Sequence, residues 1–139
     1  MQYGCGHSAP SGWRNFDASP TLRFERIPLL GKLYTKNATR FPSSVEFGDI
    51  VSGLPVKESS VKAVYCSHIL EHLALDDFRK ALANTHKILV SGGGFRIVLP
   101  DLEFSMKQYT SSSSADAASL FMRETSLGQE YRSRGVTGF

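Results

Sequence analysis

Residues 61–99 constrain the fold more than any other segment, because they predict a strand, a helix and a second strand in succession. Residues 61–66 are rich in β-branched and aromatic side chains, as strands are, and residues 95–99 form a second such run that Pro100 closes. The residues of one predicted helical face recur between them at steps of three or four: Leu75, Phe78, Leu82, Thr85 and Leu89. A strand, a crossover helix and a strand form a right-handed unit with parallel strands.

The predicted helix has a start signal and a stop signal. Asp76 can cap its start, and the triple glycine at residues 92–94 can end it. Three shorter strands are predicted earlier in the chain, at residues 2–3, 14–17 and 44–48. This alternation predicts an α/β fold with a mainly parallel sheet. Ligands of such sheets bind at the carboxyl ends of the strands, so the residues that follow strands are the candidate site.

A Gly-x-Gly turn follows the first strand, and such a turn lets backbone approach a ligand closely. With Ala9, the glycines Gly4 and Gly6 match the fingerprint of dinucleotide sites. Such a site also needs a helix facing the pyrophosphate and an acidic residue about 20 positions further on. Residues 10–12 (Pro-Ser-Gly) interrupt any helix, and Asp17 follows Gly4 by only 13 positions. The spacing therefore predicts a ligand with a ribose but no pyrophosphate.

Two aspartates stand at the ends of predicted strands. Asp17 can accept hydrogen bonds from both ribose hydroxyls, and Asp49 can accept one from an exocyclic adenine amine. Each has a structural alternative, because aspartate also stabilises turns and caps helices. Their position beside the Gly-x-Gly turn favours the functional interpretation.

Several motifs follow one another in a recognisable order. They are Tyr3-Gly4-Cys5-Gly6, Gly12-Trp13-Arg14-Asn15-Phe16-Asp17, Glu46-Phe47-Gly48-Asp49-Ile50, residues 61–73 and residues 89–101. Together they resemble class I S-adenosylmethionine-dependent methyltransferases, of the methyltransferase type 11-like kind with a short first crossover. The resemblance covers residues 2–104. It implies a Rossmann-like methyltransferase sheet and S-adenosyl-L-methionine as the cofactor.

The resemblance also implies which residues bind that cofactor. They are Gly4, Cys5, Gly6, Asp17, Asp49, Ile50, Cys66 and Ser67. The Gly-x-Gly turn would line the methionine and ribose portions, where Asp17 would hold the ribose hydroxyls. Asp49 and the backbone of Ile50 would read the adenine, and Cys66 and Ser67 would border the methionine moiety.

His68 follows the fourth predicted strand and would face the methyl acceptor. Methyl transfer from a sulfonium requires mainly alignment of the nucleophile with the methyl group. A general base is needed where the acceptor keeps its proton until late in the reaction. His68 is the first candidate for this catalytic role, ahead of Asp101 and His7. The alternative for His68 is a helix-start residue that is hydrogen-bonded to nearby backbone.

The C-terminal part departs from the family pattern. The antiparallel strand pair that normally closes this fold is not recognisable, and the spacing after residue 101 is helical. We predict a methyltransferase core at residues 1–110 and a Ser-rich hinge with a helical tail at residues 111–139. The chain is then either a fragment or a minimal form whose open sheet edge is covered by the tail or by another subunit, which makes a homo-oligomer a candidate assembly.

Two alternative functions compete with methyl transfer. Residues 68–72 (His-Ile-Leu-Glu-His) match the H-x-x-E-H motif of zinc peptidases. That motif belongs in the middle of a helix with a third acidic ligand nearby, whereas here it directly follows a strand, so we expect no metal. The second alternative is a non-catalytic cofactor-binding or partner subunit of the same fold.

Composition narrows the class of partner. The net charge of +3 comes without a dense basic stripe, so no nucleic-acid partner is expected. No apolar run approaches the roughly 20 residues that span a bilayer, and the start lacks a signal peptide, so we expect no membrane partner and a cytoplasmic location. Cys5 and Cys66 should remain free thiols, and Trp13 should be a packing residue. Analogy with the family suggests a small-molecule or saccharide acceptor.

Overall fold

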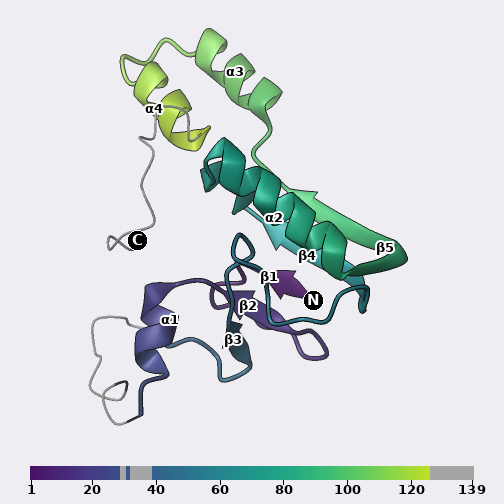
Figure 1. Ribbon diagram of the computed structural model, residues 1–139. Helices are drawn as coiled ribbons and strands as arrows, with labels where there is room; N and C mark the ends of the chain where they lie inside the picture. The colour runs from purple at the N-terminus through teal and green to yellow at the C-terminus, as the bar shows by residue number, and fades with distance from the viewer. Residues whose placement is uncertain (29–30, 32–38, 126–139) are drawn as a thin grey trace.

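The computed structural model describes residues 1–28, 31 and 39–125. Its strands are β1 (Gln2–Tyr3), β2 (Asn15–Asp17), β3 (Val45–Phe47), β4 (Val61–Ser67) and β5 (Leu89–Val98). They form one sheet in the order β3-β2-β1-β4-β5, in which all neighbouring strands are parallel (Figure 1). The predicted α/β class and Rossmann-like sheet are thus confirmed. The strand order reverses between β1 and β4, where sheets of this kind bind their ligands.

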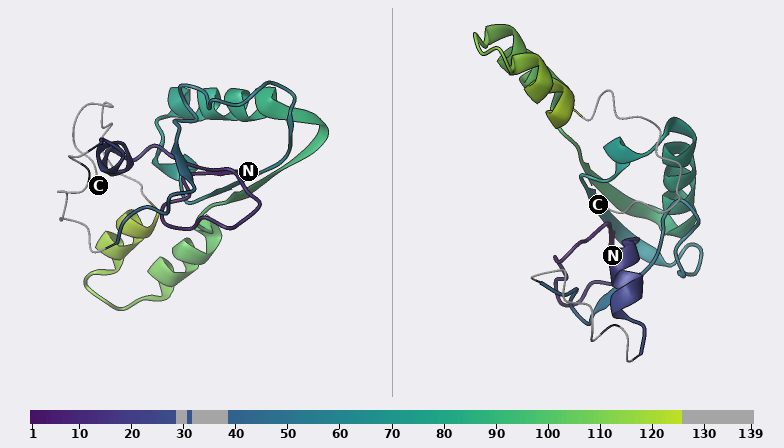
Figure 2. Two further views of the ribbon diagram at one scale, coloured as in Figure 1. Left: turned by 90° about the horizontal axis from the view of Figure 1, so that it is seen from below. Right: turned by 90° about the vertical axis from the view of Figure 1, so that its left-hand side faces the viewer.

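The helices are α1 (Pro20–Glu25), α2 (Leu75–Ile88), α3 (Leu102–Ser111) and α4 (Ala117–Glu124), with a 3₁₀ turn at Leu70–His72. Helix α2 lies along one face of the sheet, and the hairpin of α3 and α4 projects beyond the end of the sheet (Figure 2). The described strands contain no antiparallel pair. The division at residue 110 stays a prediction, and residues 126–139 of the predicted tail lie outside the described residues.

The main core lies between α2 and the sheet. Its buried members include Tyr3, Phe16, Val64, Cys66, Ala81 and Ile88. The hydroxyl of Tyr3 lies 3.2 Å from Oγ1 of Thr85, and this Oγ1 donates to the carbonyl of Ala81 over 2.8 Å. This buried contact links the two-residue strand β1 directly to α2, which positions the turn that follows β1.

The predicted start of α2 was wrong. Ala74 precedes the first helical residue, Leu75, and no side chain caps this end. Asp76 instead lies in the first turn and pairs with Arg79 over 3.3 Å. Leu75 is 61% exposed, so the buried stripe is narrower than expected and includes Ala81, Thr85 and Ile88.

The triple glycine at residues 92–94 does not end the helix, which is a second correction. Helix α2 ends at Ile88, and β5 begins at Leu89. The glycines lie inside β5, where the pairing with β4 is irregular. Val61 pairs with Leu89 and Ala63 pairs with Gly94, so β5 has more residues than β4 between these two pairs. Gly92 has a φ of +76°, and a side chain on Gly93 would lie 2.9 Å from the carbonyl oxygen of Val90. The glycines therefore allow the extra residues of β5 to bulge out of the ladder.

Candidate functional site

The turn after β1 has the conformation expected of a ligand-binding backbone. Gly4 and Gly6 have φ values of +62° and +53°, which favour glycine. A side chain on Gly4 would collide with Ile69, whereas one on Gly6 would meet no heavy atom within 4 Å. The turn is held by the backbone N–H of Cys5, which donates to the carbonyl of Phe16 over 3.1 Å. Gly4 is therefore required by packing, and Gly6 faces open space.

Asp17 ends β2 directly beside this turn. Its Oδ2 accepts a hydrogen bond from the backbone N–H of Gly6 over 2.8 Å, and its Oδ1 accepts one from Ser19 at the same distance. Ser19 in turn caps α1 by accepting from the N–H of Thr21. One carboxylate thus joins the β1 turn, the end of β2 and the start of α1.

Asp49 reaches the same edge of the sheet through β3. The N–H of Gly48 donates to the main-chain carbonyl of Asp17 over 3.0 Å. A side chain on Gly48 would lie 2.8 Å from both Leu54 and Phe16, so only glycine allows this approach. Asp49 Oδ1 accepts from the N–H of Val51 over 2.9 Å, which makes a local turn.

The turn after β3 is tied to α2 by a residue that the sequence did not single out. Asn84 Nδ2 donates to the carbonyl of Ile50 over 2.8 Å and to that of Val51 over 3.1 Å. Ile50 is 5% exposed, and its side chain belongs to the core. The local sequence around Asn84 could not predict this contact, because the contact joins residues that are 34 positions apart in the chain.

The two cysteines lie near the ends of neighbouring strands, since Tyr3 pairs with Cys66 across β1 and β4. Both are free thiols, which confirms the prediction that they form no disulfide. Burial raises the pKa of the Cys66 thiol to about 11, and burial together with the nearby charge of Asp17 raises that of Cys5 to about 11. Both side chains are therefore neutral at physiological pH. Ser67 is the last residue of β4 and pairs with Val98.

His68 follows β4 in an uncommon conformation, with a φ of +53° in the left-handed region. Such a backbone costs about 1–3 kcal/mol in a residue other than glycine and occurs often at functional sites. Its Nδ1 lies 3.1 Å from Oε1 of Glu71 in the 3₁₀ turn. The side chain of His68 is 58% exposed, while that of Glu71 is only 12% exposed. The imidazole of His68 therefore contacts a side-chain carboxylate, whereas its backbone N–H donates to the carbonyl of Val98 over 3.0 Å.

The other candidate bases have different partners. The ring of His7 stacks on Phe41 at 4.7 Å between centroids, and its Nε2 lies 3.2 Å from the carbonyl oxygen of Thr39. Asp101 caps α3 by accepting from the N–H of Phe104 over 3.0 Å. Both contacts give these side chains a structural role.

The zinc interpretation of residues 68–72 finds no support in the described part of the chain, where no group of three or more His, Cys, Asp or Glu side chains could hold a metal. The segment directly follows β4, and its last three residues form a 3₁₀ turn, not the middle of an α-helix. As a separate finding, none of the helices in the described ranges has the length and apolar character that crossing a membrane requires.

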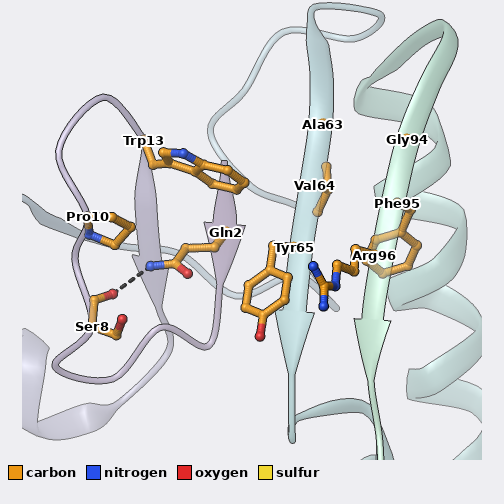
Figure 3. A pocket seen from close by; sticks show the side chains of 10 residues that line it. All are labelled: Gln2, Ser8, Pro10, Trp13, Ala63, Val64, Tyr65, Gly94, Phe95 and Arg96. Atoms are coloured by element: carbon orange, nitrogen blue, oxygen red, sulfur yellow. Dashed lines mark hydrogen bonds between the residues drawn. The ribbon is translucent and has the colours of Figure 1, made fainter.

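A shallow cleft of about 660 Å³ lies on the sheet, lined by the β1–β2 loop and by strands β1, β4 and β5. Figure 3 shows its side chains in front of the strands, with Tyr65 and Arg96 next to each other. The Arg96 guanidinium lies 5.9 Å from the centre of the Tyr65 ring. Trp13 is 42% exposed and lines this cleft, so it does not belong to the buried core, and its packing role stays a prediction. None of the predicted site residues lines the cleft; they lie at the carboxyl ends of the strands instead.

The comparison with known proteins bears on this arrangement. A family model described as a methyltransferase domain matches residues 2–97, which include β1 to β4 and most of β5. No curated protein matches the chain. The match spans more than half of the 139 residues and confirms the resemblance seen in the motifs. The chain therefore belongs to the methyltransferase domain family.

Proposed function

We propose that this chain binds S-adenosyl-L-methionine at the carboxyl edge of its sheet and transfers the methyl group to a small-molecule or saccharide acceptor. One observation carries the proposal: the turns after β1, β2 and β3 are joined at this edge by hydrogen bonds. The N–H of Gly6 donates to the Asp17 carboxylate, and the N–H of Gly48 donates to the Asp17 carbonyl. Membership of a methyltransferase family supports the same cofactor.

The residues at this edge fit a nucleoside. The space beside Gly6 is open, so a ligand can approach the backbone there. Each oxygen of Asp17 accepts one backbone N–H, and a carboxylate oxygen can accept a second hydrogen bond. Asp17 therefore retains the capacity to accept from two ribose hydroxyls. Asp49 and Ile50 follow β3, which pairs with β2, and we propose that the Asp49 carboxylate and the backbone of Ile50 contact the adenine.

The proposed roles of the remaining residues follow from their environment. Cys5 and Ser67 would border the methionine portion between β1 and β4, where the neutral Cys5 thiol offers contact without competing as a nucleophile. Cys66 is 1% exposed in the core, so it would support this part of the site and would not contact the ligand through its thiol. The cofactor, when bound, supplies a methyl group that its sulfonium has already activated. The chain must then align the acceptor and remove its proton. His68 is proposed as the catalytic base, a role worth about 10²–10⁴-fold in rate.

Calorimetric titration with S-adenosyl-L-methionine tests the cofactor site. We expect binding to the unmodified chain and at least a tenfold loss of affinity in Asp17→Ala and in Asp49→Ala. Asp76→Ala is the matched control, because Asp76 is exposed and, among the described residues, its ion pair is with Arg79 on the surface of α2. Unchanged affinity in both site variants would refute the assignment of these two aspartates.

A non-catalytic partner subunit is the second candidate function. Large apolar side chains that are 39–58% exposed favour it, since exposed apolar patches often mark interaction surfaces. They lie on α3 and α4: Leu102, Phe104, Met106, Tyr109, Leu120 and Met122. A partner subunit would bind the cofactor without releasing S-adenosylhomocysteine, which a turnover assay distinguishes from an enzyme. If these side chains meet a second copy of the chain, the molar mass in solution will be that of a homo-oligomer.

The cellular location is also a proposal. The thiols of Cys5 and Cys66 are free, and free thiols persist in reducing compartments. This supports the cytoplasm. Measuring the free thiols in protein isolated from the native cell would test it, since complete oxidation of both would contradict a cytoplasmic location.

A further inference from the structure

The imidazole of His68 has two distinct environments. Its Nδ1 faces Oε1 of Glu71 at 3.1 Å, and within the described residues its Nε2 makes no hydrogen bond. A carboxylate can only accept hydrogen bonds, so the contact requires the proton of a neutral imidazole to stay on Nδ1. Nε2 is then an acceptor on an exposed ring.

Glu71 is suited to hold this arrangement, because its own position is restricted. It lies in the 3₁₀ turn, whose first residue, Leu70, is 2% exposed in the core. The N–H of Leu73 donates to the carbonyl of Leu70 over 3.2 Å and closes the turn. The second carboxylate oxygen, Oε2, is buried and has no hydrogen-bond partner among the described residues. Among the described residues, the hydrogen bond that this carboxylate accepts is therefore the one from His68, at Oε1.

The backbone of His68 adds a second restriction. Its N–H donates to the carbonyl of Val98 over 3.0 Å, so the residue continues the ladder between β4 and β5. The left-handed φ of +53° then turns the chain sharply into the 3₁₀ turn. The side chain is thus carried at the carboxyl edge of the sheet by the end of a strand and oriented by a buried acid three residues later.

We propose that Glu71 is a positioning residue that keeps His68 in the Nδ1–H tautomer, with Nε2 ready to accept a proton from the methyl acceptor. The use of Nε2 rests on the proposed function, whereas the tautomer does not. In the transfer, the acceptor atom would bond to the methyl carbon as the carbon–sulfur bond breaks with its electron pair going to sulfur. Nε2 of His68 would accept the acceptor proton, and the Glu71 carboxylate would stabilise the resulting imidazolium.

The tautomer is measured directly by long-range ¹H–¹⁵N spectra of the full chain labelled with ¹⁵N-histidine, at pH 8.5, where an ordinary imidazole is neutral. We expect the His68 signals of an imidazole with protonated Nδ1 and unprotonated Nε2. Glu71→Ala removes the acceptor and Glu71→Gln can donate as well as accept, so both variants should lose this preference. Glu103→Ala, which removes the exposed pair with Lys107, is the control and should leave His68 unchanged.

The outcomes separate this inference from the proposed function. The signals of His7 and His86 report whether each variant is folded. Protonated Nε2 in the unmodified chain, or an unchanged Nδ1–H preference in both folded Glu71 variants, would overturn the positioning role. Loss of the preference with unchanged affinity for S-adenosyl-L-methionine supports it. A failure of the unmodified chain to bind the cofactor would refute the proposed function and leave the tautomer result standing.

Discussion

The backbone N–H of Gly6 donates a hydrogen bond to Oδ2 of Asp17 over 2.8 Å, and this contact joins the turn after β1 to the end of β2. The two strands contribute only two and three residues to the sheet, so few ladder hydrogen bonds hold them. The carboxylate therefore supports the local fold as well as the proposed ribose site. Structure and proposed chemistry depend on the same side chain.

Asp17→Ala should lower the free energy of unfolding by about 1–3 kcal/mol, because two backbone N–H groups lose a charged acceptor. Urea denaturation followed by circular dichroism measures this. Asp76→Ala, on the exposed face of α2, should change stability by less than about 0.5 kcal/mol. Equal effects of the two substitutions would show that the Asp17 contacts contribute nothing specific.

Alanine at the two turn glycines should have unequal effects. Both substitutions meet a positive φ, which costs about 1–2 kcal/mol, but only Gly4→Ala also collides with Ile69. Thermal unfolding should therefore show a larger loss for Gly4→Ala than for Gly6→Ala. Adding Ile69→Ala should recover part of the Gly4→Ala loss relative to Ile69→Ala alone. An equal loss at both positions would contradict the packing described for Gly4.

The cysteines should be slow to alkylate below their raised pKa of about 11. An unfolded thiol titrates at about 8.5, so between that pH and about 11 the unfolded chain loses protons that the folded chain keeps. The protonated thiols therefore make their full contribution to the free energy of unfolding below about pH 8.5, and this contribution is lost as the pH rises to about 11. Iodoacetamide labelling at pH 8.5, read by mass spectrometry in native buffer and in guanidinium, measures the protection. Equal labelling rates in both conditions would contradict the raised pKa values.

Thr85→Val should destabilise the chain by about 1–3 kcal/mol, because it removes the hydroxyl that faces Tyr3 in the core at nearly constant side-chain volume. Thr110→Val is the matched control, since the Thr110 hydroxyl bonds to helix carbonyls on the exposed surface of α3. Chemical denaturation of both variants provides the comparison. If the Thr85→Val variant is as stable as the Thr110→Val control, the contact between Tyr3 and Thr85 makes no net contribution to the free energy of unfolding.

The features that the sequence predicted well are those set by local pattern and by topology. Residues 61–66 are rich in β-branched and aromatic side chains, and this segment is part of strand β4, in which Val64 and Cys66 are buried. Because parallel strands end at the same edge of a sheet, the strand assignments alone predicted that Asp17 lies close to the Gly4 turn. Strand identity and sheet edge were therefore predictable.

The features that sequence analysis missed depend on contacts distant in the chain or on burial. Aspartate often caps helices, but α2 begins one residue before Asp76, at Leu75, so Asp76 lies in the first turn. Glycine often ends a helix, but Gly93 lies within strand β5. A side chain there would come within 3.2 Å of the carbonyl oxygen of Lys62 on the neighbouring strand. Glu71 matches the zinc motif by residue type, and its contact with the His68 imidazole depends on the 3₁₀ turn, which the sequence did not predict.

Hydrogen–deuterium exchange, with and without S-adenosyl-L-methionine, tests most directly whether the strand-end turns form the cofactor site. We expect the ligand to slow exchange in the peptides that contain Gly4–Gly6, Asp49 and His68, and to leave exchange in the cleft beside Trp13 and Arg96 unchanged. Protection confined to that cleft, or no protection at saturating ligand, would contradict the account.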